Sequence, residues 1–354
     1  MAMPMASNIP SPSLEGLARV ASGINIADYL VPTSGLPPVD PAEGAFRFIC
    51  EPSHNAYNDP IVFPGQPGKS HLHTFFGNTL TDADSTYASL RTTGNSTCNN
   101  LLNRSAYWVP AMMNGRGKVV MPDFISVYYK RADGQGKCQK LALDCLQLPR
   151  GLRYIFGYNM ANPAASSPAE KRWWTCDGGP SAGVHFANIP QAAKACPIGA
   201  RIGMVLVAPD CWDGKNLDSP DHRSHIVYSV RDPNTGADAC DAGHPHRVPH
   251  FQIGVYWTVD ATLDRSGNES PDADTWYLAS DRMVGMANAV PGTTEHSDWF
   301  GAWEDSILDT WTNNCIAKLL SCVAGDLGNG TALKPIRGYS FTNTTTLVDP
   351  PARP

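Results

Sequence analysis

The sequence predicts a mainly β fold, with a β-sandwich or jelly-roll-like core, long loops and one C-terminal helix. Gly (31) and Pro (30) are abundant among the 354 residues, and this composition favours turns and shaped loops over helical bundles. Hydrophobic residues make up 42% of the chain, which is enough for a core. Short segments of alternating or β-branched and aromatic residues recur along the chain, as is typical of half-buried strands.

The first 43 residues are expected to form an N-terminal extension or strap, and residues 44–354 a single large β-rich domain. Within the extension, residues 13–23 are predicted to form a short helix capped by Ser13. The Pro-rich stretch 31–42 is predicted to be an extended linker.

Seven segments of the main body carry a strand pattern: 45–50, 119–130, 153–158, 201–207, 225–230, 251–259 and 336–341. The clearest is 251–259, in which Phe251, Ile253 and Val255 fall on one side of the strand.

One amphipathic helix is predicted at about residues 299–320, where Trp303, Ile307 and Trp311 follow helical spacing. In an unbroken helix, Cys315 and Cys322 would lie roughly 10 Å apart along the axis. That separation is too long for a disulfide. Either these cysteines pair elsewhere, or the helix ends between them.

The cysteines are even in number and dispersed: Cys50, Cys98, Cys138, Cys145, Cys176, Cys196, Cys211, Cys240, Cys315 and Cys322. No CxxC pair occurs, so we expect up to five disulfides rather than a zinc ribbon. Disulfides imply an oxidising compartment, hence a secreted or periplasmic protein. The N-terminus lacks the basic and apolar stretches of a secretory signal, so we expect a removed signal or another export route.

The charge pattern argues against a nucleic-acid partner, and the distribution of apolar residues argues against a membrane span. The net charge is −6 and no Lys/Arg block is present, whereas nucleic-acid binding needs a basic face. No apolar run approaches the roughly 18–20 residues that a membrane span requires.

Histidine placement gives the strongest functional signal. Seven of the ten histidines form three tight groups, which are His71 with His73, His222 with His225, and His244 with His246 and His250. An eighth, His296, stands two residues before Asp298. Histidine is the usual side chain for metal binding and for proton transfer near neutral pH. We therefore expect one polar site assembled from distant segments.

His71 and His73 project to the same side if they lie in a strand. This spacing suits a two-nitrogen metal clamp, or two ring donors aimed at an anionic sugar or phosphate. The alternative is a pair of histidines at the edge of the core that are bonded to carbonyls.

The segment 213–225 concentrates short acidic and imidazole side chains, among them Asp218, Asp221, His222 and His225. Such density is repulsive unless a cation, an arginine or a substrate compensates it. Calcium is an option for its oxygens, although the EF-hand spacing is absent. Asp221 is placed to orient His222. The alternative is a solvated turn.

Three other segments offer candidates. His244 lies in a loop that enters a strand, and its ring could instead cap backbone groups. His296 and Asp298 precede the predicted helix, where Asp298 would serve either as a helix cap or in the site. Arg91 could clamp a carboxylate, and Trp212 could stack on a sugar, although surface arginines and buried tryptophans are the commoner cases.

Several long stretches resemble a known family: Asp59–Gly68, Ser70–Asn78, Ser105–Pro110, Cys211–Tyr228, His244–Pro249 and His296–Trp303. Through them the chain resembles the secreted domain of unknown function numbered nineteen-ninety-six, found in fungi and bacteria. The resemblance implies an extracellular location and frequent company with carbohydrate-binding modules. This is a link to glycans by association only.

We therefore expect an extracellular carbohydrate-active enzyme with a glycan partner, a glycoside hydrolase rather than a polysaccharide lyase. The expected catalytic residues are Asp218, Asp221, His222, His296 and Asp298. The expected substrate-binding residues are His71, His73, Arg91, Trp212, Asn216, His225 and His244.

Two alternatives stay open. One is a zinc or copper hydrolase or redox enzyme that binds a divalent metal through His71, His73, His222 and His225. The other is a non-catalytic glycan-binding module, in which the histidines would be structural supports. The sequence alone does not fix a cofactor.

Overall fold

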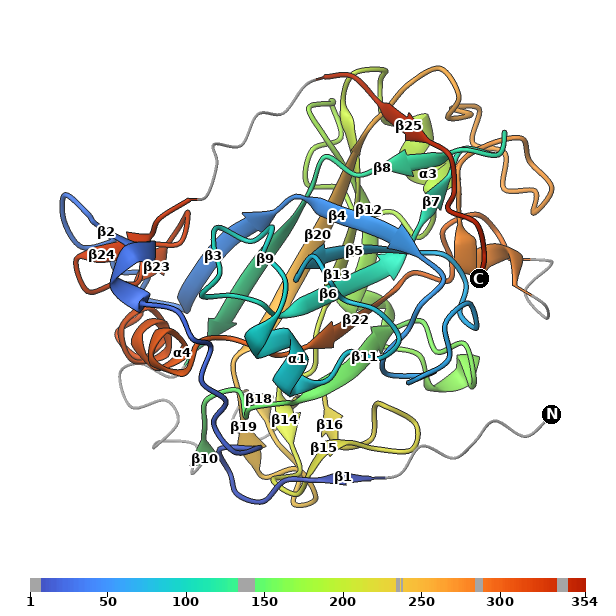
Figure 1. The fold of residues 1–354 in the computed structure, drawn as a ribbon. Helices are drawn as coiled ribbons and strands as arrows, with labels where there is room; N and C mark the ends of the chain where they lie inside the picture. The colour runs from blue at the N-terminus through green and yellow to red at the C-terminus, as the bar shows by residue number, and fades with distance from the viewer. Residues whose placement is uncertain (1–7, 133–143, 234–235, 237, 284–288, 336–342) are drawn as a thin grey trace.

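The fold is mainly β, as the sequence predicts, and two large sheets form its body (Figure 1). The structure is a computed structural model that describes residues 8–132, 144–233, 236, 238–283, 289–335 and 343–354.

The first large sheet is antiparallel and has the strand order β11 (Arg153–Gly157), β22 (His296–Phe300), β6 (Ala106–Pro110), β5 (His73–Gly77) and β4 (Pro52–Ala56). The second has the order β12 (Arg172–Asp177), β13 (Arg201–Val207), β20 (His250–Thr258), β9 (Phe124–Arg131), β3 (Gly44–Cys50) and β23 (Ser321–Cys322). Its strands are antiparallel except for the parallel pair β3 and β23.

The two large sheets pack face to face through aromatic side chains. The hydroxyls of Tyr107 on β6 and Tyr129 on β9 are 2.8 Å apart. The ring of Phe251 on β20 lies 5.3 Å from that of Trp299 on β22. All four residues are buried, so the core of the molecule lies between the sheets.

Side chains alternate along a strand, so the residues between these core positions project from the outer face of the five-stranded sheet. One row runs across that face in register: Phe75 opposite Trp108, Trp108 opposite Asp298, and Asp298 opposite Ile155. Phe75, Trp108 and Asp298 are buried. The outer face is therefore covered by neighbouring segments, and it carries a carboxylate within an apolar surround.

The remaining strands form small sheets. They are β10 (Asp144–Cys145), β19 (His246–Arg247), β14 (Cys211–Trp212) and β16 (Ile226–Val227) in one sheet, and β21 (Tyr277–Leu278), β7 (Met112–Met113), β8 (Val119–Met121) and β25 (Thr346–Val348) in another. Three pairs complete the set: β1 (Ile9–Pro10) with β15 (Asn216–Asp218), β2 (Leu30–Pro32) with β24 (Thr331–Leu333), and β17 (Val230–Arg231) with β18 (Asp238–Ala239). Through β1 and β2, the described residues 8–43 pair with strands of the main body.

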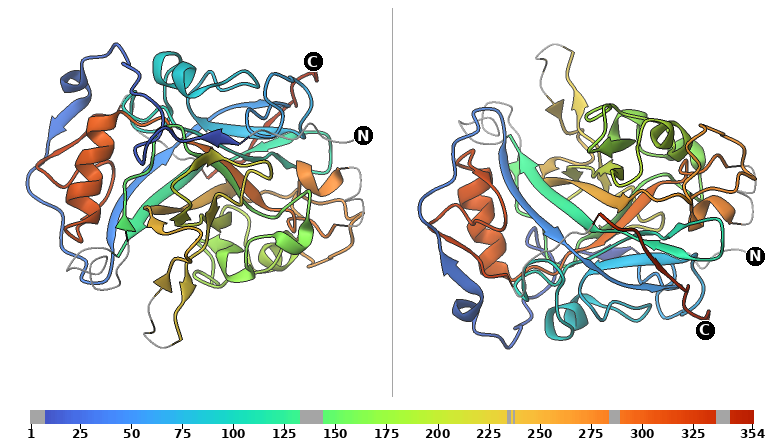
Figure 2. Two further views of the ribbon diagram at one scale, coloured as in Figure 1. Left: turned by 90° about the horizontal axis from the view of Figure 1, so that it is seen from below. Right: turned by 90° about the horizontal axis from the view of Figure 1, so that it is seen from above.

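The helices of the described residues are short: α1 (Tyr87–Thr92), α3 (Ile189–Lys194) and α4 (Asp305–Trp311), which continues as a π turn over Thr312–Ile316. The described residues also include four 3-10 turns, at Ile26–Tyr29, Pro163–Ala165, Ala169–Lys171 and Ala279–Arg282. Helix α4 lies at one end of the molecule (Figure 2). There, the ring of Trp311 stacks on Phe46 of β3 at 5.3 Å.

The predicted start of the C-terminal helix at residue 299 is wrong. Residues up to Phe300 belong to β22, and the helix begins at Asp305. Trp299 packs in the core and Phe300 on the outer face, an alternation that apolar content alone does not distinguish from helical spacing. The helical segment ends before Cys322, and Cys315 and Cys322 form a disulfide, which was one of the two expected outcomes.

The predicted helix at 13–23 is also wrong, because these residues form a turn, an isolated bridge between Gly16 and Arg150, and then irregular backbone. Gly16 has a φ of +86°, and a Cβ there would lie 2.3 Å from the carbonyl oxygen of Arg150. The segment instead bonds to Arg150, which donates to Glu15 O at 2.8 Å and accepts from Leu17 N at 3.0 Å.

Four predicted strands are confirmed within a residue, as β3, β11, β13 and β20. The predicted strand 119–130 is two strands, β8 and β9, and 225–230 holds only the short β16 and the start of β17. The predicted strand 336–341 lies outside the described residues.

Four disulfides join described cysteines: Cys50 to Cys98, Cys176 to Cys196, Cys211 to Cys240, and Cys315 to Cys322. Cys145 is also disulfide-bonded, and Cys138 lies outside the described residues. Such bonds persist in oxidising compartments. In the described part of the chain, no helix has the length and apolar character of a membrane span.

Candidate functional site

Three histidines converge on the outer face of the five-stranded sheet. His73 begins β5, His71 lies two residues before it, and His296 begins β22. The ring centroid of His71 is 4.1 Å from that of His73 and 5.1 Å from that of His296. One nitrogen from each ring lies within 4.8 Å of the others. We call these three residues the His trio.

Strand β11 passes close to the His trio because it ends in glycine. Gly157 pairs with His296 in register and has a φ of +93°. A Cβ at this position would lie 2.7 Å from the Cα of His296 and 2.5 Å from the carbonyl oxygen of Glu295. A larger residue would therefore displace the strand that carries His296.

Backbone carbonyls fix the tautomer of two rings in the His trio. The Nδ1 atom of His73 is 3.0 Å from the carbonyl oxygen of Asn58, and that of His296 is 2.8 Å from the carbonyl oxygen of Thr294. A carbonyl only accepts hydrogen bonds, so Nδ1 carries the proton and Nε2 keeps its lone pair. The Nε2 atoms of His71 and His73 are buried and have no partner.

Burial keeps the His trio neutral. It lowers the pKa of His73 to about 3, and the pKa of His296 to about 4. Burial also lowers the pKa of His71, and the neighbouring rings of His73 and His296 lower it further. A neutral imidazole with a free Nε2 is the form that binds a metal ion.

Two buried carboxylates lie next to the His trio. Asp298 is on β22, on the same face as His296, and neither of its oxygens has a hydrogen-bond partner. Asp59 lies in the segment before β5, and its Oδ1 accepts from the backbone N–H groups of Ile61 and Val62, each at 2.9 Å.

The two carboxylates repel each other electrostatically. Burial raises the pKa of Asp298, and the negative charge of Asp59 raises it further. Burial also raises the pKa of Asp59 to about 6. The pair Asp59 and Asp298 therefore holds a proton more readily than exposed carboxylates do.

A His–Asp–Arg chain stands beside the carboxylate pair. His222 has a left-handed φ of 57°, and its carbonyl oxygen accepts from Ile155 N on β11 at 3.0 Å. Its Nδ1 is 2.8 Å from Oδ1 of Asp218, whose Oδ2 is 2.9 Å from Nε of Arg153. When His222 is protonated, its charge lowers the pKa of Asp59, so the two side chains are near each other.

Arg223 connects this group with a pocket of about 200 Å³. It lines the pocket together with Ile155, Asn159 and Ser166. Burial lowers the pKa of Arg223, and the charge of Asp298 opposes that shift. Because Ile155 is in register with Asp298, the pocket adjoins the outer face that carries the carboxylate pair.

The remaining residues predicted from the segment 212–225 serve the loop itself. Asp221 is exposed, lines the 200 Å³ pocket and accepts from the backbone N–H groups of Arg223 and Ser224. The prediction that it orients His222 is wrong, because Asp218 bonds to that ring. Both ring nitrogens of His225 are engaged, Nδ1 with Ser219 Oγ at 2.8 Å and Nε2 with Arg153 O at 2.9 Å.

The other predicted binding residues lie elsewhere in hydrogen-bond networks of their own. Trp212 is buried and donates to Asn216 O at 2.6 Å, while Asn216 donates to Asp213 at 2.7 Å. The two ring nitrogens of His244 lie 3.0 Å from Asp241 Oδ1 and 2.8 Å from Ser224 O. Arg91 is buried and pairs with Glu304.

The metal-ligand set that the sequence suggests therefore differs from the set that the structure brings together. His71 and His73 are joined by His296, while His222 bonds to Asp218 and His225 bonds to Ser219 and a backbone carbonyl. Sequence reasoning did not select Asp59 or Arg223. Their only signal is position, Asp59 before the His71 segment and Arg223 directly after His222.

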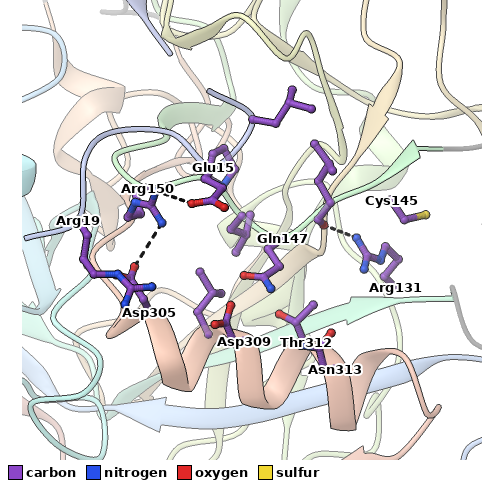
Figure 3. A pocket seen from close by; sticks show the side chains of 15 residues that line it. Glu15, Arg19, Arg131, Cys145, Gln147, Arg150, Asp305, Asp309, Thr312 and Asn313 are labelled. Carbon is purple, nitrogen blue, oxygen red and sulfur yellow. Dashed lines mark hydrogen bonds and ion pairs between the residues drawn. The ribbon is translucent and has the colours of Figure 1, made fainter. Parts of the chain in front are cut away.

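A separate pocket of about 390 Å³ lies between residues 145–150 and α4 (Figure 3). Arg150 spans one wall, at 2.8 Å from Glu15 and 3.9 Å from Asp305. No residue predicted for the site lines this pocket.

Comparison with known proteins agrees with the resemblance found in the sequence. The family model described as "Domain of unknown function (DUF1996)" matches residues 59–303. No curated protein and no solved structure matches the chain. The matched range includes the His trio, both buried carboxylates and the His222 chain. Because the model matches more than half of the sequence, the chain belongs to the DUF1996 family.

Proposed function

We propose that the protein is a secreted, metal-dependent hydrolase that cleaves glycosidic bonds of an extracellular glycan. The observation that carries this proposal is the placement of His296 and Asp298 on one face of β22. This placement combines the His trio and the carboxylate pair in one site. The disulfides favour the extracellular location.

The His trio fits a divalent transition metal. Three imidazole nitrogens are the donor set of a catalytic zinc site, and in His73 and His296 a backbone carbonyl holds the other nitrogen of the ring. Two buried Nε2 atoms without partners cost free energy unless a ligand occupies them. An ion bound there would supply Lewis-acid polarisation of an oxygen atom.

The chain's own residues account for the proton movements of hydrolysis. The carboxylate pair, Asp59 and Asp298, holds a proton that passes to the glycosidic oxygen as its bond to the anomeric carbon breaks. His222, oriented by Asp218, accepts a proton from the water whose oxygen forms the new bond to that carbon. The products are an alcohol and a hemiacetal, so atoms and charges balance.

The glycan assignment has two supports. A pair of carboxyl groups is the usual machinery of glycoside hydrolysis. The 200 Å³ pocket presents hydroxyl and amide groups from Asn159, Ser166 and Ser224, and these groups suit sugar hydroxyls.

The test uses protein purified without a histidine tag, stripped by a chelator and reloaded with zinc. A polysaccharide panel is assayed for new reducing ends. We expect His73→Ala to lose both the ion and the activity. Asp298→Asn should keep the ion and lose activity by about 100-fold or more. The control is His244→Gln, which changes a histidine outside the site and should leave both readouts unchanged.

Two outcomes would contradict the proposal. The metal part fails if the wild-type protein retains less than about a tenth of an equivalent of zinc, copper, nickel or manganese after loading and gel filtration. The glycan part fails if a metal-loaded protein cleaves no polysaccharide of the panel.

A further inference from the structure

The C-terminal segment reaches the His trio from a distant part of the fold. Strand β25 pairs with β8, with Leu347 opposite Val120, and Lys118 binds Asp349 at 2.6 Å. From there the chain runs to the loop before β5 (Figure 1).

Arg353 is the residue of this segment that meets the site. Its Nη2 is 3.3 Å from the carbonyl oxygen of Ser70, the residue before His71. Its guanidinium lies 4.4 Å from the centre of the Tyr57 ring. The positive charge of Arg353 contributes to the lowered pKa of His71, after burial and the neighbouring histidines.

Among the described residues, no carboxylate lies within ion-pair distance of Arg353. The side chain is exposed. Stacking on Tyr57 occupies one face of the guanidinium and leaves N–H groups at its edge for another acceptor.

Arg223 is a second arginine near the site without an ion-pair partner in the described part of the chain. Its guanidinium donates to the backbone carbonyls of Gly157 at 3.3 Å and Tyr158 at 2.7 Å. It lines the 200 Å³ pocket and acts electrostatically on Asp298 and His296. The Arg223 guanidinium is thus a partly desolvated cation whose hydrogen-bond partners are carbonyl groups. An anion bound in the pocket would stabilise its positive charge.

Several other arginines of the fold are already held by ion pairs, although the buried Arg104 also donates to a backbone carbonyl, that of Arg91. Each of four pairs with a carboxylate at 2.9 Å or less: Arg91 with Glu304, Arg153 with Asp218, Arg172 with Glu295, and Arg201 with Asp123. The two arginines beside the His trio and the carboxylate pair are thus available for a ligand. A neutral glycan would make no use of their charge.

We propose that the substrate is an acidic polysaccharide, and that Arg353 and Arg223 bind the carboxylates of its uronic acid units. This inference rests on the proposed function and adds the substrate class. A guanidinium binds a carboxylate through two parallel hydrogen bonds. The chain carries a net charge of −6, so an acidic polymer needs such local positive groups to approach the site.

The test measures binding of short uronate oligosaccharides by calorimetry, with zinc-loaded Asp298→Asn protein so that the ligand stays intact. The ligands are galacturonate, glucuronate and mannuronate oligomers, each compared with its carboxyl-reduced, neutral counterpart. We expect at least one uronate to bind about 10-fold or more tightly than its neutral counterpart.

Variants then assign the binding residue. Arg353→Gln is expected to remove this preference, and Arg353→Lys to keep part of it, because lysine retains the charge but not the bidentate geometry. The matched control is Arg116→Gln, an exposed arginine that faces Asp274 at 3.5 Å. Melting temperatures verify that each variant is folded.

Equal binding of the acidic and neutral forms, no binding of any uronate, or unchanged binding by Arg353→Gln would overturn the inference. A sulfated oligosaccharide without uronic acid units serves as a further arm, and a preference for it over every uronate would overturn the carboxylate assignment. These outcomes are separate from the proposed function, because the metal content and the activity of the wild-type protein are measured independently.

Discussion

His296 and Asp298 occupy two outward positions of β22, roughly 7 Å apart along the strand. Both side chains are buried beneath the segments that cover the five-stranded sheet. An ion held by His296 would therefore lie beside a carboxylate that has no hydrogen-bond partner. A shared location on one rigid strand makes the relative placement of metal and acid insensitive to loop motion.

Replacing His73 with phenylalanine separates a structural role from metal binding. The change removes a buried, unpartnered Nε2 but also the bond to Asn58 O. We expect the metal-free protein to change in unfolding free energy by only about 1 kcal/mol.

The effect of zinc should differ sharply between the two proteins. Zinc at 1,000 times its Kd should stabilise the wild type by about 4 kcal/mol and leave His73→Phe unchanged. Denaturant unfolding with and without zinc measures both quantities. A large loss of stability in metal-free His73→Phe would show that His73 supports the core.

Asp298→Asn should be more stable than the wild type at neutral pH and yet inactive. The carboxylate is buried without a hydrogen-bond partner, and burial together with the charge of Asp59 raises its pKa. A neutral amide of similar shape relieves that repulsion and cannot supply the proton for cleavage. Urea unfolding and activity are measured on the same preparation, and Asp274→Asn, the same change at an exposed carboxylate outside the site, serves as the control. A less stable, fully active variant would be the opposite of this expectation.

Asp218 acts through His222, so their substitutions should not add. Asp218 holds Nδ1 of His222 at 2.8 Å and is itself held by Arg153. We expect Asp218→Asn and His222→Gln each to lower kcat by about 100-fold, and the double variant to lower it no further. Steady-state kinetics of the three proteins checks this expectation. Multiplicative losses would mean that the two residues act separately.

His250 offers a pH test away from the His trio. Its Nδ1 is buried without a partner, and burial lowers its pKa to about 3. The unfolded chain binds this proton near pH 6.5, so the contribution of the neutral ring to stability is complete above pH 6.5 and is lost as the pH falls toward 3.

His250→Gln does not titrate and should therefore show a shallower loss of stability across this range, by at most about 1.4 kcal/mol per pH unit. Urea unfolding at pH 7, 6, 5 and 4 gives the two slopes. Parallel slopes for wild type and variant would mean that the pKa of His250 is the same in the folded and the unfolded protein, so that burial does not lower it.

The two-residue alternation of side chains along a strand was sufficient to predict that part of the site which His71 and His73 form. Alternation along a strand puts His71 and His73 on one side. The addition of His296 depends on the strand order β5, β6, β22, which joins segments more than 200 residues apart. A helical interpretation of residues 299–320 hid that strand and left the role of a helix cap open for Asp298 beside its expected role in the site, whereas Asp298 lies in the middle of β22.

The second histidine group shows why spacing alone misleads. His222 and His225 are close in sequence, but the left-handed backbone at His222 and the bonds of each ring send them to different partners. Asp59 and Arg353 reach the site from segments without regular patterns, the first from a turn before β5 and the second from the end of the chain. Only the assembled fold brings such residues together.

Anomalous diffraction from zinc-loaded crystals, recorded on both sides of the zinc absorption edge, is the most direct test of a metal site at the His trio. The account predicts one strong peak per chain, about 2.0–2.1 Å from a ring nitrogen of each of His71, His73 and His296. A fully loaded crystal with no peak at the His trio, or with its only peak at His222 and His225, would contradict it.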